Sequence, residues 1–203
     1  MRIIGLTGGI AAGKSVVSSH LIKLGAAVIS ADEIAKRIMR PGGSGIKKIM
    51  EEMPRFAPDG VLDRAAFRTA IFSDPSVKRK SDALLHPIII EQTRRRLDEL
   101  KKAGVRAAVI DAPLLIEAGM QSMCDEVWLV VADMEQRIER IMARDGVERE
   151  QAEAAIRSQM PDDEKRKYAL AVIDNSGTVE QTLAAAERLF TTALKGEGYG
   201  SKV

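Results

Sequence analysis

The stretch GGIAAGKS, residues 8–15, constrains the fold of this chain more than any other feature. It lies between an apolar run at 3–6 and a segment at 15–24 whose apolar residues have helical spacing. Its residues match the pattern G-x-x-x-x-G-K-[ST] at Gly8, Gly13, Lys14 and Ser15. A strand before this pattern and a helix after it are the context in which it binds phosphates, so the sequence predicts a nucleoside triphosphate site.

Each residue type in this loop has a physical reason to be there. Glycine lets the backbone turn so that successive N–H groups point inward, and the following helix adds the positive end of its dipole. Lys14 is expected to reach the β- and γ-phosphates. The Ser15 hydroxyl is expected to join the oxygen ligands of Mg²⁺, most of which are water and phosphate oxygens.

Short apolar runs alternate with longer helical patterns along the chain, which is typical of parallel βαβ units. Strands are expected at residues 2–7, 26–29, 105–111, 126–132 and 169–173, and the last helix from Thr178 to about Lys195. The predicted fold class is α/β: a three-layer, P-loop-containing nucleoside triphosphate hydrolase-like fold around a five-stranded parallel sheet, with a helical insertion domain and a lid.

The segment between the second and third expected strands is far longer than a crossover needs. Residues 34–102 are helical in pattern and carry 16 basic against 9 acidic residues, whereas the whole chain has a net charge of only +2. We expect a helical subdomain for an anionic acceptor, although any one of these basic residues, such as those at 94–96 and 101–102, could instead belong to a solvated surface. The expected division is a single 1–203 domain with a nucleotide-binding core at 1–33, 103–132 and 169–195, an insertion at 34–102, a lid at 133–168 and a flexible tail at 196–203.

Composition excludes several broad classes of protein. The near balance of charge lacks the basic excess typical of bulk nucleic-acid or membrane-surface binding. The apolar run at 127–132 is far shorter than the ~20 residues of a membrane span. We expect a cytoplasmic monomer or weak homo-oligomer with small-molecule partners. Cys124, the single cysteine, has no basic sequence neighbour that would stabilise a thiolate, so it is not expected to be a nucleophile.

Two carboxylates each follow an expected strand. They therefore lie at the carboxyl ends of the parallel strands, where ligands bind in sheets of this kind. Ser30 and Glu33 have capping-box spacing, which places Asp32 in the first turn of the next helix. The helix dipole favours an ionised carboxylate there, and such a group can orient a hydroxyl and collect its proton late in phosphoryl transfer. Asp32 could instead serve the dipole alone, and Asp111, at the end of the third strand, could organise its loop or hold Mg²⁺-bound water.

Residues 133–145 are helical in pattern and carry three arginines on one face: Arg137, Arg140 and Arg144. Arg137 is expected to pair with Asp133, four residues earlier, and Arg144 with Glu148, four residues later. Arg140 has no acid at such a spacing, and a guanidinium of that kind fits phosphate, unless it is simply solvated. The stretch is therefore predicted to act as a lid over the nucleotide.

Loops of this kind occur in GTPases, in motor and transport ATPases, and in small-molecule kinases. The sequence has no guanine-reading N-K-x-D, and its D-x-x-G match at 174–177 lies far behind the loop. Nucleic-acid ATPases would be expected to carry acidic D-E motifs and a larger core. A small-molecule kinase remains.

Over about residues 2–190, the sequence resembles the dephospho-coenzyme A kinases. The stretches that carry the resemblance are GLTGGIAAGKS at 5–15, Ala31-Asp32, Pro41-Gly42, Leu62-Asp63-Arg64, Phe72, His86-Pro87, DAPLLIE at 111–117, Arg140 with Arg144, Gln159, and VIDN at 172–175. The His-Pro pair and the D-x-P-L-L-x-E stretch are far more particular than the phosphate loop.

The resemblance implies transfer of the ATP γ-phosphoryl group to the 3′-hydroxyl of the ribose in dephospho-coenzyme A, with Mg²⁺. It implies catalytic roles for Asp32 as the acceptor base, for Lys14, and for Arg140 as the lid arginine. The ATP-binding residues that it implies are Gly9, Ile10, Ala11, Ala12, Gly13, Lys14, Ser15, Val16, Arg140, Arg144 and Asn175. The acceptor-side candidates are Asp32, Arg64, His86, Asp111, Pro113 and Leu114, and the metal ligand is Ser15. His86, just before Pro87 at an expected helix start, is interpreted as structural.

Three positions depart from the usual pattern of that family: Ser30 and Leu170 stand where aspartate is usual, and Lys36 where arginine is usual. The first departure leaves Asp32 as the sole carboxylate at its strand end. Two other functions remain open, namely another nucleoside or nucleotide kinase, and a nucleotide-dependent regulatory module without turnover. The presence of Asp32 with Lys14 argues against the module, because a pure binder needs no acceptor base.

Overall fold

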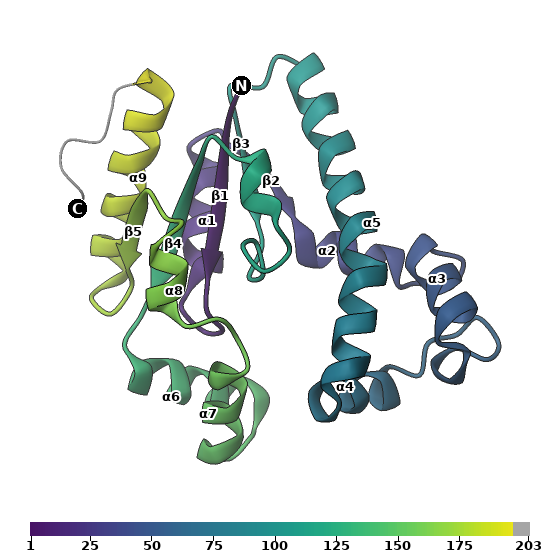
Figure 1. Cartoon of the computed structure of the whole chain (residues 1–203). Helices are drawn as coiled ribbons and strands as arrows, with labels where there is room; N and C mark the ends of the chain where they lie inside the picture. The colour runs from purple at the N-terminus through teal and green to yellow at the C-terminus, as the bar shows by residue number, and fades with distance from the viewer. Residues whose placement is uncertain (197–203) are drawn as a thin grey trace. The chain divides into compact units, whose positions relative to one another are not determined.

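The computed structural model describes residues 1–196. At Phe72 it describes the backbone but not the side chain. The chain forms two compact units (Figure 1). One unit comprises Met1–Ile29 and the chain from Glu99 onward, and the other comprises Ser30–Asp98. The tail expected at 196–203 lies outside the described residues beyond Gly196.

The first unit is built on a five-stranded sheet in the order β2-β3-β1-β4-β5. Its strands are β1 (Arg2–Gly8), β2 (Ala27–Ser30), β3 (Ala107–Asp111), β4 (Glu126–Val131) and β5 (Ala171–Asp174). Strand β1 runs parallel to both β3 and β4, and β4 runs parallel to β5. The predicted α/β class and parallel sheet are confirmed, with strand ends within about two residues of those expected.

The strands form because their apolar runs are nearly continuous, as in sheets whose two faces are both covered. All six residues of β4 are buried, and so are four of the five in β3. Helices α1 (Lys14–Lys23) and α9 (Val179–Lys195) contribute Leu21 and Phe190 to the core around Trp128. Thr178 caps α9 in a capping box with Gln181, as the sequence predicts.

Three helices lie between β4 and β5 in the chain: α6 (Met134–Asp145), α7 (Arg149–Arg157) and α8 (Asp162–Arg166). Ile138, Ile141 and Ala152 form a small core between α6 and α7, and Ile10 and Ala11 of the phosphate loop pack against it. A short 3-10 turn, η2 (Met120–Met123), precedes β4. The region expected to be a lid is thus packed on the outside of the phosphate loop.

The second unit is helical, as its sequence pattern predicts (Figure 1). It contains α2 (Ala31–Ile38), α3 (Ser44–Glu52), η1 (Pro54–Phe56), α4 (Arg64–Ser73) and most of α5 (Pro75–Lys102). Phe56 and Phe67 meet edge to face at its centre, with ring centroids 5.2 Å apart. Across residues 1–196, no helix combines the length and apolarity that crossing a membrane would require.

Candidate active site

The phosphate loop joins β1 to α1. Gly13 stands at the N-terminal boundary of α1 with φ of 90°, in the left-handed region, and a Cβ there would overlap the side-chain amide of Asn175. Both facts require glycine at this position. No side chain of the described residues caps α1, so the N–H groups of its first turn, apart from the Val16 N–H that donates to the Gly13 carbonyl at 3.0 Å, are left for a ligand. This is the arrangement that binds phosphate at a helix N-terminus.

Asn175 lies behind this loop. Its side chain is buried, donates from Nδ2 to the Ala12 carbonyl at 2.9 Å, and accepts from the Thr182 hydroxyl at 2.9 Å. The resemblance implies a contact between Asn175 and the nucleotide. In the structure the amide links the loop to Thr182 of α9, and the contact with the nucleotide stays a prediction.

Arg140 extends from α6 to the same loop. Its guanidinium donates to the Ala11 carbonyl at 3.1 Å and to the Asn175 carbonyl at 3.3 Å, and it contacts Gln136 at 3.2 Å. Among the residues that the structure describes, Arg140 has no acidic partner, as its sequence spacing predicts. A cation that is balanced only by neutral oxygens remains available to a phosphate.

The pairings expected for the other two arginines of α6 are wrong. Arg144 pairs with its neighbour Asp145 at 2.7 Å rather than with Glu148. Arg137 is only 6% exposed and pairs with Asp162 at 3.0 Å rather than with Asp133. The Asp133 carboxylate is occupied otherwise, because it caps α6 by accepting from the first-turn N–H groups.

Lys14 and Asp111 meet in an ion pair between the phosphate loop and the end of β3. Asp111, an acceptor-side candidate from the sequence, has its carboxylate against the loop lysine in this structure. Ser15 is exposed at the second position of α1. A hydroxyl and a nearby carboxylate suit the oxygen preference of Mg²⁺, which usually takes one or two protein ligands and fills its shell with water and phosphate oxygens.

The loop that follows β3 is fixed by a lysine that sequence reasoning missed. Lys165 of α8 is wholly buried, donates to the Pro113 carbonyl at 2.9 Å and pairs with Glu117 at 3.1 Å. The Thr7 hydroxyl donates to the same carbonyl at 3.2 Å. Pro113 and the adjoining Leu114, expected as acceptor-side residues, therefore lie in a loop tied to the sheet and to α8. Nothing in the charged local sequence DDEKRK marks this one lysine as buried.

The second unit carries the candidate base. The Ser30 hydroxyl accepts from the Glu33 N–H at 3.2 Å, which confirms the predicted cap of α2. Asp32 is the second residue of α2, in its first turn. Lys36 holds the pKa of the Glu33 carboxyl below its ordinary value through a 2.7 Å ion pair.

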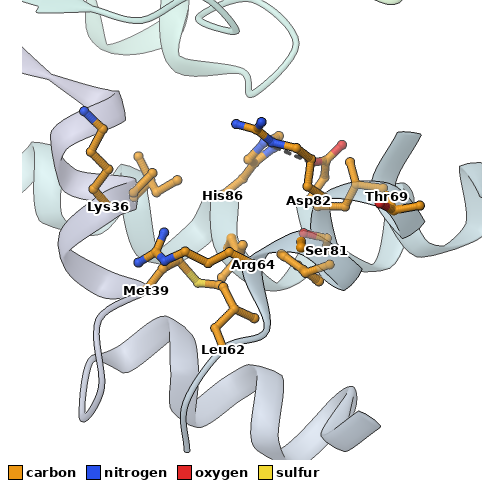
Figure 2. A pocket seen from close by; sticks show the side chains of 15 residues that line it. Lys36, Met39, Leu62, Arg64, Thr69, Ser81, Asp82 and His86 are labelled. Carbon is orange, nitrogen blue, oxygen red and sulfur yellow. Dashed lines mark ion pairs between the residues drawn. The ribbon is translucent and has the colours of Figure 1, made fainter. Parts of the chain in front are cut away.

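A groove of about 810 Å³ opens in the second unit between α2, α4 and α5 (Figure 2). Apolar side chains that include Met39, Leu62 and Phe67 form part of its wall, and Lys36 and Arg64 stand at its edge. Arg64 and Arg68 lie one turn apart on α4, and within the described residues neither has an acidic partner. Like charges at this spacing repel each other, so an anion bound in the groove would stabilise them.

His86 faces the same groove, and its expected position at a helix start is wrong (Figure 2). Helix α5 runs through Pro87 without ending, and Nε2 of His86 lies 3.6 Å from Asp82 one turn earlier. Proline lacks an N–H and disfavours a helical residue before it, but a 28-residue helix packed in its unit overrides that local preference.

Cys124 is a poor candidate for chemistry, in agreement with the sequence. Burial, with the charge of Asp125, raises the pKa of its thiol to about 12. Its Sγ lies near the Met120 carbonyl at 3.6 Å. A thiol with so high a pKa is protonated at neutral pH and is not nucleophilic.

A family sequence model described as Dephospho-CoA kinase matches residues 2–181. The chain belongs to the dephospho-CoA kinase family. A curated dephospho-CoA kinase from Geobacter sulfurreducens is 45% identical over 192 residues, which cover 94% of this chain and 98% of the relative. One from Symbiobacterium thermophilum is 42% identical, covering 98% of this chain and 84% of the relative. The family, the fold and the enzyme class predicted from the sequence are confirmed.

Solved structures agree with this assignment. The dephospho-CoA kinase of Campylobacter jejuni is 25% identical and superposes with a TM-score of 0.71, covering 97% of this chain and 99% of that one. A Thermus thermophilus crystal structure is 34% identical with a TM-score of 0.80, covering 94% and 96%. A shikimate kinase from Acinetobacter baumannii, 18% identical with a TM-score of 0.55, covers 97% of this chain and 94% of its own and shares the fold.

Proposed function

We propose that this dephospho-CoA kinase family member transfers the γ-phosphoryl group of ATP to the 3′-hydroxyl of the ribose in dephospho-coenzyme A, giving coenzyme A and ADP. The observation that carries the proposal is the family match over residues 2–181, which spans the phosphate loop, Asp32 and the groove. The uncapped start of α1 and the glycine-dependent turn before it support ATP as the donor.

In this reaction the acceptor 3′-oxygen forms a bond to the γ-phosphorus while the bond between that phosphorus and the β,γ-bridging oxygen breaks, and ADP leaves. The hydroxyl proton passes to a carboxylate, and we assign this role to Asp32. Its place in the first turn of α2 supports an ionised side chain, because the N-terminal end of a helix stabilises negative charge. The role requires Asp32 to reach the hydroxyl once both substrates are bound.

The phosphate loop and Lys14 hold the ATP phosphates in this proposal. The Lys14 ammonium exchanges Asp111 for phosphate oxygens when the nucleotide enters. Mg²⁺, when bound, supplies positive charge shared by the phosphate oxygens, and the exposed Ser15 hydroxyl would be its protein ligand. Asp111, once released by Lys14, can then orient water near that ion.

Arg140 stabilises the charge on the transferring phosphoryl group. Its partners in the structure are the two carbonyls and the Gln136 amide oxygen, all uncharged, which supports a turn of the guanidinium toward phosphate. Arg144 is held by Asp145 and is assigned a smaller part. We expect Arg140→Ala to lower kcat more than it raises the KM for the acceptor, because Arg140 acts in the transition state.

The groove of the second unit is assigned to the acceptor. Dephospho-coenzyme A carries a pyrophosphate and a long, weakly polar pantetheine arm. The unpaired Arg64 and Arg68 suit the pyrophosphate, and the apolar wall suits the arm. The basic surplus of residues 34–102 supports this division of labour.

A cytoplasmic location and a monomeric or weakly associated state belong to this proposal as well. The near-neutral net charge and the single cysteine support the location. Size-exclusion chromatography with light scattering tests the state, and a stable larger assembly at micromolar concentration would contradict it.

The test is ADP release, coupled to a spectroscopic readout, with dephospho-coenzyme A as the only acceptor, and with mass spectrometry of the product. We expect ADP and a 3′-phosphorylated product in equal amounts. A panel of nucleosides and nucleotides serves as the matched comparison. Faster turnover with one of those acceptors would indicate another nucleotide kinase, and ATP binding without turnover on any acceptor would indicate a regulatory module.

A further inference from the structure

Three successive carbonyls of the phosphate loop are held from outside by side chains. Ile10 accepts from Nε of Arg137 at 3.0 Å, Ala11 from Arg140 at 3.1 Å, and Ala12 from Asn175 at 2.9 Å. In a trans peptide the carbonyl and the following N–H point in opposite directions. The bonds to the Ile10 and Ala12 carbonyls therefore turn the N–H groups of Ala11 and Gly13 away from their donors, toward the concave side of the loop where phosphate binds, whereas the Ala12 N–H donates to the Gly9 carbonyl at 3.1 Å.

Arg137 differs from the other two donors in how completely it is built into the protein. Its side chain is 7% exposed and the Asp162 carboxylate that pairs with it is 22% exposed. While Nε holds the Ile10 carbonyl and Nη1 pairs with Asp162, Nη2 lies so close to Gly9 that a Cβ on Gly9 would overlap it. The three nitrogens of the guanidinium, Nε, Nη1 and Nη2, thus lie against Ile10, Asp162 and Gly9 respectively.

The loop needs such support because part of it is strained. Ala11 has φ of 59°, the one non-glycine residue with positive φ in the described part of the chain. A residue with a side chain is unfavourable in the left-handed region and persists there only where its surroundings hold it in place. Arg137 and Arg140 hold the carbonyls on either side of the Ala11 α-carbon.

Ile10 is also held at its N–H, in the preceding peptide unit. Its N–H donates to Oε1 of Gln159 at 2.7 Å, and Gln159 lies in the connection between α7 and α8. Asp162, the partner of Arg137, begins α8 three residues later. Gln159 and Asp162 therefore both hold Ile10 in place. Gln159 accepts from the Ile10 N–H directly, and Asp162 pairs with the arginine that holds the Ile10 carbonyl.

We propose that Arg137 is a positioning residue for nucleotide binding: by holding the Ile10 carbonyl outward and the strained Ala11 in place, it keeps the Ala11 N–H directed at the phosphates of ATP. Asp162 is the counter-ion that fixes the guanidinium in this orientation. The inference rests on the proposed function only in that the loop binds ATP, and it does not depend on the identity of the acceptor.

The experiment measures ATP binding by calorimetry without any acceptor, followed by steady-state kinetics. Arg137→Gln removes the charge and the fork, and we expect the dissociation constant for ATP to rise about tenfold or more, as expected when a charged hydrogen-bond donor is lost. The KM for ATP rises with it, whereas kcat at saturating ATP and the KM for dephospho-coenzyme A stay within about twofold, since uniform nucleotide binding is what is lost. Arg137→Lys, which keeps the charge without the fork, is expected to rescue part of the affinity.

A matched control is Arg149→Gln. Arg149 also lies on the lid helices and pairs with carboxylates, Glu135 and Glu153, and within the described residues none of its hydrogen bonds or ion pairs reaches the phosphate loop. We expect its ATP affinity to equal that of the unaltered chain. An equal loss in both variants would overturn the proposal, because general loosening of the lid would then explain the effect.

Arg137→Gln leaves Asp162 without its buried partner, and this variant could fail to fold. The double variant Arg137→Gln with Asp162→Asn removes both charges, is expected to fold, and is expected to bind ATP about tenfold more weakly for the same reason. A folded single or double variant that binds ATP within twofold of the unaltered chain would overturn the proposal. If the unaltered chain itself bound no ATP, both this proposal and the proposed function would be contradicted.

Discussion

The phosphate loop and the groove of the second unit both suit anions, but they do so by different means. In the loop, backbone N–H groups face the ligand, and side chains behind the loop, among them Asn175 and Arg140, hold the backbone in place. In the groove, the positive groups are the side chains themselves, on the exposed faces of α2 and α4. ATP binding by the loop should therefore be sensitive to a single added atom, such as a Cβ on a glycine. Acceptor binding in the groove should instead weaken by a smaller factor for each cation that is removed.

The largest effect is expected for Lys14, whose positive charge is assigned to the ATP phosphates. Lys14→Met should lower kcat/KM for ATP about 1,000-fold, the scale on which preorganised electrostatic groups act. The coupled ADP-release assay measures it. Lys23→Met is the matched control, because Lys23 is exposed at the other end of the same helix, and it should be near normal. A loss of only a few fold at Lys14 would contradict its phosphate-binding role.

Gly13→Ala tests whether the loop depends on backbone geometry. The new Cβ would overlap Asn175, and Gly13 has φ of 90°, so the loop would have to shift. A displacement near 1 Å in such a site can lower activity about 100-fold, and we expect ATP affinity to fall by a similar factor. Isothermal titration with ATP measures the loss.

The control for this variant is Gly25→Ala. Gly25 has φ of 93°, and its Cβ would have no neighbour within 4 Å. It therefore shares the backbone strain without the overlap, and we expect lower thermal stability with normal ATP affinity. Normal ATP affinity in Gly13→Ala as well would contradict the dependence of the loop on glycine at this position.

The groove should respond more mildly and only toward the acceptor. Arg64→Gln and Arg68→Gln should each raise the KM for dephospho-coenzyme A about tenfold, because one charged hydrogen bond is lost, and leave the KM for ATP unchanged. Arg95→Gln removes an exposed arginine on α5 that pairs with Glu91 outside the groove, and it should change neither constant. A rise in the KM for ATP instead would place these arginines in the nucleotide site.

Cys124 lies outside the groove and the phosphate loop, and its chemical labelling tests the packing of the first unit instead. Because the pKa of its thiol is raised to about 12 by burial, the thiolate population at pH 8 is far lower in the folded protein than in the unfolded chain, whose thiol has its ordinary, lower pKa. Labelling by iodoacetamide at pH 8 should be at least about 100-fold slower in native than in denaturing buffer. Similar rates in both buffers would show that the core of the first unit opens readily.

The sequence predicts what is local in this molecule. Parallel strands read as apolar runs because both faces of the sheet are covered, and the caps at Ser30 and Thr178 follow from residues three positions apart. The phosphate loop is likewise local, since glycine spacing, strand and helix are contiguous.

The parts that sequence reasoning missed depend on residues distant in the chain. Asp133 is four residues from Arg137, but its carboxylate accepts hydrogen bonds from N–H groups in the first turn of α6. Arg137 therefore pairs with the more distant Asp162. Lys165 is buried only because Glu117 and Pro113 lie opposite it. Arg68 could have been found from its helical spacing to Arg64, which puts two cations on one face.

The most direct test of the division between a nucleotide-binding loop and a separate acceptor base is turnover of Asp32→Asn at saturating ATP and dephospho-coenzyme A. Glu33→Gln, one position along the same turn, is the control and should be near normal. We predict that Asp32→Asn binds ATP within twofold of the unaltered chain and forms ADP at least about 100-fold more slowly, the scale of a lost general base. Near-normal turnover in Asp32→Asn would show that another group receives the acceptor proton.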